Sequence, residues 1–115
     1  MAHTRGRLCD PVEAPPRGET VHLLVELGSG RVEQILSGRL DGPVDYVQDA
    51  DEWVMVVHGR ATLEVEGDRT EMGPGDWVLL PAGTAHRLVA TDPGTSWLAV
   101  TTAPAPARPR PGGGG

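Results

Sequence analysis

The chain has 115 residues and a formal net charge of −6, and all 10 of its basic residues are arginine. This length fits one domain, and the absence of lysine excludes both a Schiff base and a P-loop lysine. An acidic chain argues against a nucleic-acid surface, which needs a basic stripe. No apolar run approaches the roughly 20 residues that span a bilayer, and no segment reads as a signal peptide. We therefore expect a cytoplasmic protein that binds neither nucleic acid nor membrane.

Both ends of the chain differ in composition from the middle. Residues 1–18 are rich in proline and arginine and are predicted to form a flexible leader. Residues 103–115, APAPARPRPGGGG, are predicted to form a disordered tail, extended where proline-rich and flexible in the glycine run. The single cysteine, Cys9, lies in the leader and has no disulfide partner. The folded domain is predicted to span residues 19–102.

The middle of the chain consists of short β-favouring segments separated by turns. Turn signals stand at 28–30, 67–68, 73–76 and 92–94, where glycine, proline and aspartate gather. Short strands at such spacing, with no helical stretch, indicate an all-β sandwich or barrel. The predicted strands cover residues 20–27, 31–38, 52–58, 61–67, 69–72, 77–81, 86–91 and 95–102.

The second half of the chain carries a recognisable motif, GDWVLLPAGTAH. Its spacing resembles the second motif of the cupin family, G-x5-P-x-G-x2-H followed by x3-N. The matching positions are Gly75, Pro81, Gly83 and His86, whereas Ala90 stands where the family has asparagine. The resemblance implies a small jelly-roll β-barrel of the RmlC-like type.

The end of the first cupin motif, E-x6-G, is matched by Glu52 and Gly59. The family's usual metal-binding pattern there is H-x-H-x3-E, but here Tyr46 and Gln48 stand at the two histidine positions. The sequence resembles a largely uncharacterised subset of small cupins with Tyr-x-Gln-x3-Glu in this motif. The resemblance, over roughly residues 30–102, also implies a homodimer in which residues 20–27 could pair across an interface.

Side chains in this pattern could form a metal site. Tyr46 and Gln48 are two residues apart and would share one face of a strand, and Glu52 could share it if no bulge intervenes. An amide oxygen from Gln48, a carboxylate from Glu52 and the His86 imidazole suit a divalent ion such as Mn, Fe, Ni or Zn. Coordination positions left open would serve a small organic ligand, as in a metal-dependent oxygenase, isomerase or lyase.

Two other interpretations need no metal. In one, His86 is hydrogen-bonded to Glu52 in a polar network completed by Gln48 and Tyr46, and the protein is a non-catalytic small-ligand-binding or sensor cupin. In the other, Tyr46 acts as an acid and His86 as a base, oriented by Glu52, for proton abstraction next to a carbonyl. This second arrangement resembles the sugar epimerases of the superfamily. Their phosphate sites would need interior arginines, and only Arg87 is near the motif, pointing outward.

Overall fold

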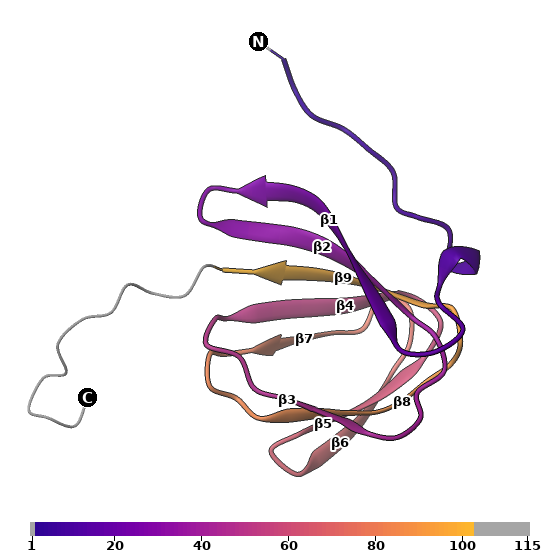
Figure 1. Cartoon of the computed structure of the whole chain (residues 1–115). Helices are drawn as coiled ribbons and strands as arrows, with labels where there is room; N and C mark the ends of the chain where they lie inside the picture. The colour runs from indigo at the N-terminus through magenta and orange to yellow at the C-terminus, as the bar shows by residue number, and fades with distance from the viewer. Residues whose placement is uncertain (1, 103–115) are drawn as a thin grey trace, which may run out of the picture.

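The computed structural model describes residues 2–102, which form two antiparallel β-sheets that face each other (Figure 1). One sheet has five strands in the order β1-β2-β9-β4-β7, and the other has four in the order β3-β8-β5-β6. The predicted all-β jelly-roll barrel is confirmed, and the predicted tail, residues 103–115, lies outside the described residues. The elements are a short 3₁₀ turn, η1 (Pro11–Glu13), and the strands β1 (Glu19–Leu27), β2 (Gly30–Ser37), β3 (Val44–Tyr46), β4 (Glu52–His58), β5 (Ala61–Val65), β6 (Asp68–Met72), β7 (Trp77–Leu80), β8 (His86–Thr91) and β9 (Thr95–Thr101).

The turn between β5 and β6 explains why β5 is shorter than predicted. Glu66 and Gly67 both have positive φ, 51° and 82°, and they join Val65 to Asp68. A two-residue hairpin with positive φ at both positions matches the twist of the strands it connects. The predicted segment 61–67 therefore ends as a strand at Val65.

A bulge in β8 overturns one expectation from strand alternation. Simple alternation places His86, Leu88 and Ala90 on the inward face. In the structure Leu63 pairs with Leu88 and Thr62 pairs with Ala90, so β8 carries one extra residue there. An extra residue shifts every later side chain to the opposite face. His86 and Leu88 are buried as predicted, whereas Ala90 is exposed.

The apolar core lies between the two sheets. Its side chains come from inward-facing positions of β4, β7 and β9 in one sheet and of β5, β6 and β8 in the other. Alternate residues on a strand point to one face, so these positions gather in a single layer. The buried core cluster consists of Val54, Val56, Ala61, Leu63, Met72, Leu80, Leu88, Trp97 and Ala99.

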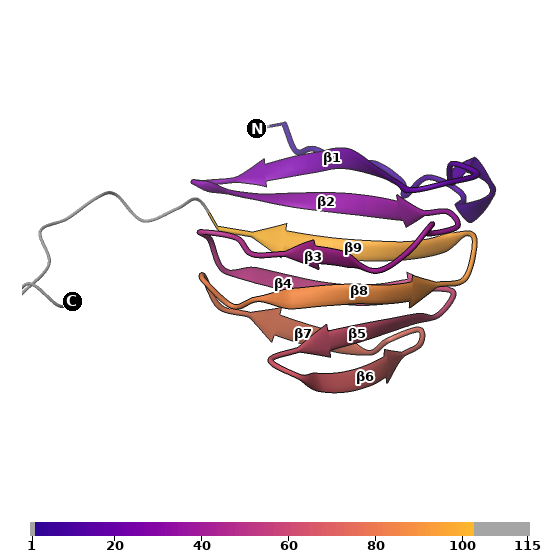
Figure 2. The ribbon, with the colours of Figure 1, turned by 60° about the horizontal axis from the view of Figure 1, so that its bottom comes forward.

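The five-stranded sheet is the larger one, and β1 and β2 extend past the edge of the opposite sheet (Figure 2). Side chains on this uncovered part are exposed to solvent: Val21 and Leu23 on β1 are each 57% exposed. The space between the sheets is consequently open on the side of β1.

The segment before β1 lies against the outer face of β2. The fully buried Gln34 amide accepts a hydrogen bond from the Cys9 N–H (2.8 Å) and donates one to the Cys9 carbonyl (3.0 Å). Further on, the Gly18 N–H donates to the carbonyl of Arg39. The flexibility of residues 1–18 stays a prediction. Over residues 2–102, no helix has the length and apolar character needed to cross a membrane.

Candidate functional site

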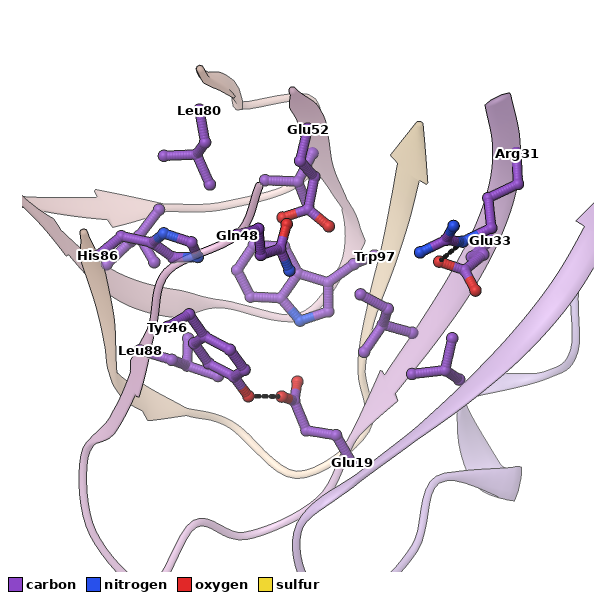
Figure 3. A pocket seen from close by; sticks show the side chains of 14 residues that line it. Glu19, Arg31, Glu33, Tyr46, Gln48, Glu52, Leu80, His86, Leu88 and Trp97 are labelled. Carbon is purple, nitrogen blue, oxygen red and sulfur yellow. Dashed lines mark hydrogen bonds and ion pairs between the residues drawn. The ribbon is translucent and has the colours of Figure 1, made fainter. Parts of the chain in front are cut away.

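A cavity of about 310 Å³ lies between the sheets near the open edge. The four predicted site residues, Tyr46, Gln48, Glu52 and His86, all line it, and their side chains point into it (Figure 3). The remaining lining residues come mainly from β1, β2, β4 and β9. They are Glu19, Val21, Arg31, Glu33, Ile35, Val54, Leu63, Leu80, Leu88 and Trp97.

The predicted residues reach the cavity from both sheets. Tyr46 is the last residue of β3 and pairs with His86, the first residue of β8. Their rings stack with centroids 5.4 Å apart and an interplanar angle of 16°. Gln48 lies in the loop after β3, and Glu52 begins β4 in the opposite sheet. The prediction that Tyr46, Gln48 and Glu52 share one strand is therefore wrong, because the chain crosses between the sheets after Tyr46.

A rigid corner brings Gln48 close to the His86 strand. The Gly83 N–H donates a 2.7 Å hydrogen bond to the Gln48 carbonyl, and the Ala82 N–H donates one of 2.8 Å to the Asp51 carboxylate. Gly83 has a φ of 82°, which glycine adopts without strain. The loop that carries Gln48 and the corner before His86 therefore hold each other in place.

The His86 imidazole, only 9% exposed, is oriented by the backbone. Its Nδ1 lies 3.2 Å from the Thr84 carbonyl oxygen. A carbonyl can only accept, so this bond requires the proton on Nδ1, and in the neutral ring the lone pair is then on Nε2. The prediction that Glu52 hydrogen-bonds and orients this ring is wrong, because the Thr84 carbonyl takes that role.

The Glu52 carboxylate faces the cavity without a hydrogen-bond or ion-pair partner among residues 2–102. Burial raises the pKa of Glu52, and the nearby His86 partly opposes this shift. The negative charge of Glu33 also raises this pKa. A carboxylate in such surroundings is stabilised by any cation that enters the cavity.

Tyr46 belongs to a hydrogen-bond chain that links the two sheets. The Tyr46 hydroxyl donates to Glu19 Oε1 (2.8 Å), and the Ser37 hydroxyl donates to Glu19 Oε2. The Trp97 indole N–H in turn donates to Ser37 Oγ (3.0 Å). Burial and the Glu19 carboxylate raise the pKa of Tyr46, so the phenol keeps its proton.

Sequence reasoning missed Glu19, Arg31 and Glu33 as cavity residues. Glu19 stands one residue before the predicted strand, and only its pairing with Ser37 places it inside. Arg31 and Glu33 are two apart, so strand alternation already placed them on one face. What the sequence does not show is that this face lines the cavity. Arg87, by contrast, points outward as predicted and pairs with Asp45 at 2.7 Å.

The described part of the chain, residues 2–102, contains no group of three or more His, Cys, Asp or Glu side chains placed to hold a metal. The predicted set has only two such side chains, Glu52 and His86, and takes its third donor from the amide of Gln48. Metal binding at this set stays a prediction.

The fold and cavity define a small barrel with a polar interior site, and the sequence matches the cupin domain family over residues 31–101. The chain belongs to the cupin family. A comparison with curated proteins finds no significant match.

Solved structures of similar proteins support this assignment. A protein from Ralstonia eutropha JMP134, described as a "putative mannose-6-phosphate isomerase", is 36% identical, with a TM-score of 0.69 over 85% of this chain and 99% of that one. KdgF from Halomonas sp. is 22% identical, with a TM-score of 0.64 over 76% and 82%. A Rhizobium leguminosarum protein of unknown function is 20% identical, with a TM-score of 0.69 over 91% and 100%. The last two comparisons bear on the fold alone.

Proposed function

We propose that this cupin binds a divalent metal ion through Gln48, Glu52 and His86 and a small organic molecule beside it. The observation that carries the proposal is the convergence of these three side chains on one cavity of about 310 Å³ (Figure 3). Between them they offer an amide oxygen, a carboxylate and an imidazole nitrogen. Such donors suit Mn, Fe, Ni or Zn.

The surroundings of His86 and Glu52 fit a metal site. Histidines that bind metals usually donate their other ring N–H to a carbonyl or carboxylate, which fixes the tautomer. His86 does this through Nδ1 and the Thr84 carbonyl, leaving Nε2 for the ion. The partly buried and unpartnered Glu52 would gain the counter-charge it lacks.

The chemistry we propose is that of an isomerase or lyase. A bound metal would polarise the ligand's carbonyl or hydroxyl oxygen. The candidate proton donor is Tyr46 at the cavity wall. Its raised pKa and its hydrogen bond to Glu19 keep the proton on the phenol, so it would act as an acid only toward a strongly basic ligand oxygen. The isomerase description of the Ralstonia protein agrees with this reaction class.

Titration calorimetry with Mn²⁺ and Zn²⁺ on protein purified without affinity metal tests the metal site. We expect one ion per chain and at least about a tenfold loss of affinity in His86→Ala, because second-sphere losses alone reach that size at metal sites. Arg87→Gln is the matched control, since this side chain is next in sequence but faces outward. Equal affinity in the wild type and His86→Ala would contradict the proposal.

A metal-free binding protein is the second candidate, and one observation favours it. No buried side-chain N or O atom within residues 2–102 lacks a hydrogen-bond partner. The fully buried polar atoms are thus satisfied without an ion, and His86 Nε2 could act on a ligand directly as a base. Ligand binding that is unchanged by a chelator would favour this candidate.

We also propose that the protein is a homodimer that uses β1. This strand is at the free edge of its sheet and exposes Val21, Leu23 and Leu27 by 57–58%. Exposed apolar edge strands are prone to pair with a second chain. Sedimentation of the wild type and Leu23→Glu tests this: a monomeric wild type would contradict it.

A further inference from the structure

We infer that the ligand of this cavity is a neutral polyhydroxylated molecule, and that Arg31 and Glu33 recognise two of its neighbouring hydroxyl groups. The inference rests on the proposed function, because it takes the cavity to be the ligand site. It adds the chemical class of the ligand and two residues that select it.

The cavity has a second polar end formed by Arg31 and Glu33. Both side chains come from the inward face of β2, and the Arg31 Nε lies 3.2 Å from Glu33 Oε1. They stand across the cavity from His86, with the Trp97 indole between the two ends (Figure 3). The Arg31 side chain is 49% exposed, so its terminal nitrogens remain accessible to a ligand.

An arginine next to a glutamate suits hydroxyl groups better than acids. A guanidinium only donates hydrogen bonds, and an ionised carboxylate only accepts them, whereas each hydroxyl does both. Two adjacent hydroxyls can therefore donate to Glu33 and accept from Arg31. An ionised carboxylate or a phosphate dianion can only accept, and would place its charge beside Glu33.

The charge of the whole cavity points the same way. Three carboxyl side chains, Glu19, Glu33 and Glu52, line it with one guanidinium, Arg31. Like charges brought together at a binding site are strongly unfavourable. A divalent ion at the His86 end would not change this, because an anionic ligand that binds the Arg31 guanidinium would still lie beside the Glu33 carboxylate. Phosphorylated and polyanionic ligands are thus disfavoured.

The wall between the polar ends is apolar. Trp97 lies there, and Ile35 and Val54 also line the cavity (Figure 3). Aliphatic and aromatic side chains of this kind pack against the C–H groups of a carbon chain or ring, while the ends of the site fix its orientation. A polyol or sugar has this combination of hydroxyl edges and C–H faces.

Saturation-transfer NMR with matched probes tests the inference. The probes are glucose, galactose and mannitol, each compared with its monophosphate ester. Each comparison is made once in the presence of a chelator and once with added Zn²⁺ and no chelator. We expect at least one neutral probe to bind at least about tenfold more tightly than its ester. No binding of any neutral probe, or tighter binding of the esters, would overturn the inference.

Variants of the pair sharpen the test. Glu33→Gln frees Arg31, and we expect it to weaken the neutral probe and strengthen the ester by about tenfold each. Arg31→Gln should weaken both probes. The matched controls are Glu64→Gln and Arg69→Gln, which break a 3.1 Å ion pair outside the cavity and should change neither. If Glu33→Gln prefers the neutral probe over its ester as strongly as the wild type does, Arg31 and Glu33 do not select the ligand.

The test separates this inference from the metal proposal. Selective probe binding with chelator present, together with failed metal calorimetry, would reject the metal site and support the inference. Metal binding with no preference between neutral probes and esters would support the metal site and reject the inference.

Discussion

The two halves of the space between the sheets differ in the side chains that fill them. Toward β6, inward positions carry Val56, Ala61 and Met72, all at most 5% exposed. Toward β1, the inward positions carry Glu19 and Glu33, which are only half-buried. We call these the closed half and the open half.

The contrast shows how one barrel separates stability from binding. Strand alternation fills both halves in the same way, but only the closed half removes apolar surface from water on all sides. The open half places charged groups where solvent or a ligand can reach them, which limits the cost of burying charge. The predictions below alter one half and measure whether the other responds.

The largest effect is expected in the closed half. Met72→Ala removes a side chain that is 2% exposed and should destabilise the fold by about 2–5 kcal/mol, through lost burial and a residual cavity. Chemical denaturation measures the change. Met55→Ala, at a half-buried position on β4, is the matched control and should cost less. Equal costs would mean that the closed half is not the main source of stability.

An intermediate effect is expected where the halves meet. Ser37→Ala leaves the Trp97 N–H and one Glu19 oxygen unpaired, at a cost of about 1–3 kcal/mol. It should also shift the NMR signals of Tyr46, the chain's single tyrosine, because Glu19 then holds the phenol less firmly. Ser96→Ala removes another buried hydroxyl, bonded to Gln34, and should leave the Tyr46 signals in place. Unmoved signals in Ser37→Ala would argue against the chain of hydrogen bonds.

The smallest effect is expected in the open half and depends on pH. Burial raises the pKa of Glu52 in the folded state above its unfolded value, so the folded protein holds this proton more tightly. Stability of the metal-free protein should then fall as pH rises from the unfolded pKa through the folded one. Glu52→Gln should remove this fall, so the difference between its thermal midpoint and that of the wild type should increase as the pH rises above the unfolded pKa of Glu52. Glu71→Gln, at an exposed position on β6, is the control and should follow the wild-type pH profile. A Glu52→Gln profile parallel to that of the wild type would contradict the pKa shift.

Much of the fold was predictable from local patterns. β4 and β8 begin and end where alternation and turns place them, at 52–58 and 86–91. The errors follow from interactions between strands that a single segment does not show. The bulge at Val89 arises in the pairing of β8 with β5, and the crossing after Tyr46 depends on two sheets facing each other.

The candidate site was predictable where a motif marked it and not elsewhere. Gln48, Glu52 and His86 stand at motif spacings, and the structure brings them to one cavity. Glu19 and Arg31 belong to no motif, and their types are those of ordinary surface residues. They enter the cavity because β1 pairs with β2 and β2 pairs with β9, which places β1 and β2 in the same sheet as Trp97 and Glu52.

The sequence by itself determined the all-β class, the turns and the residues at the His86 end of the cavity, because glycine, proline and side-chain alternation act within a few neighbouring residues. Only the tertiary structure decided which carboxylates and which arginine share that cavity. Those neighbours come from strands far apart in the chain, and their meeting depends on sheet pairing, whose register no local segment specifies.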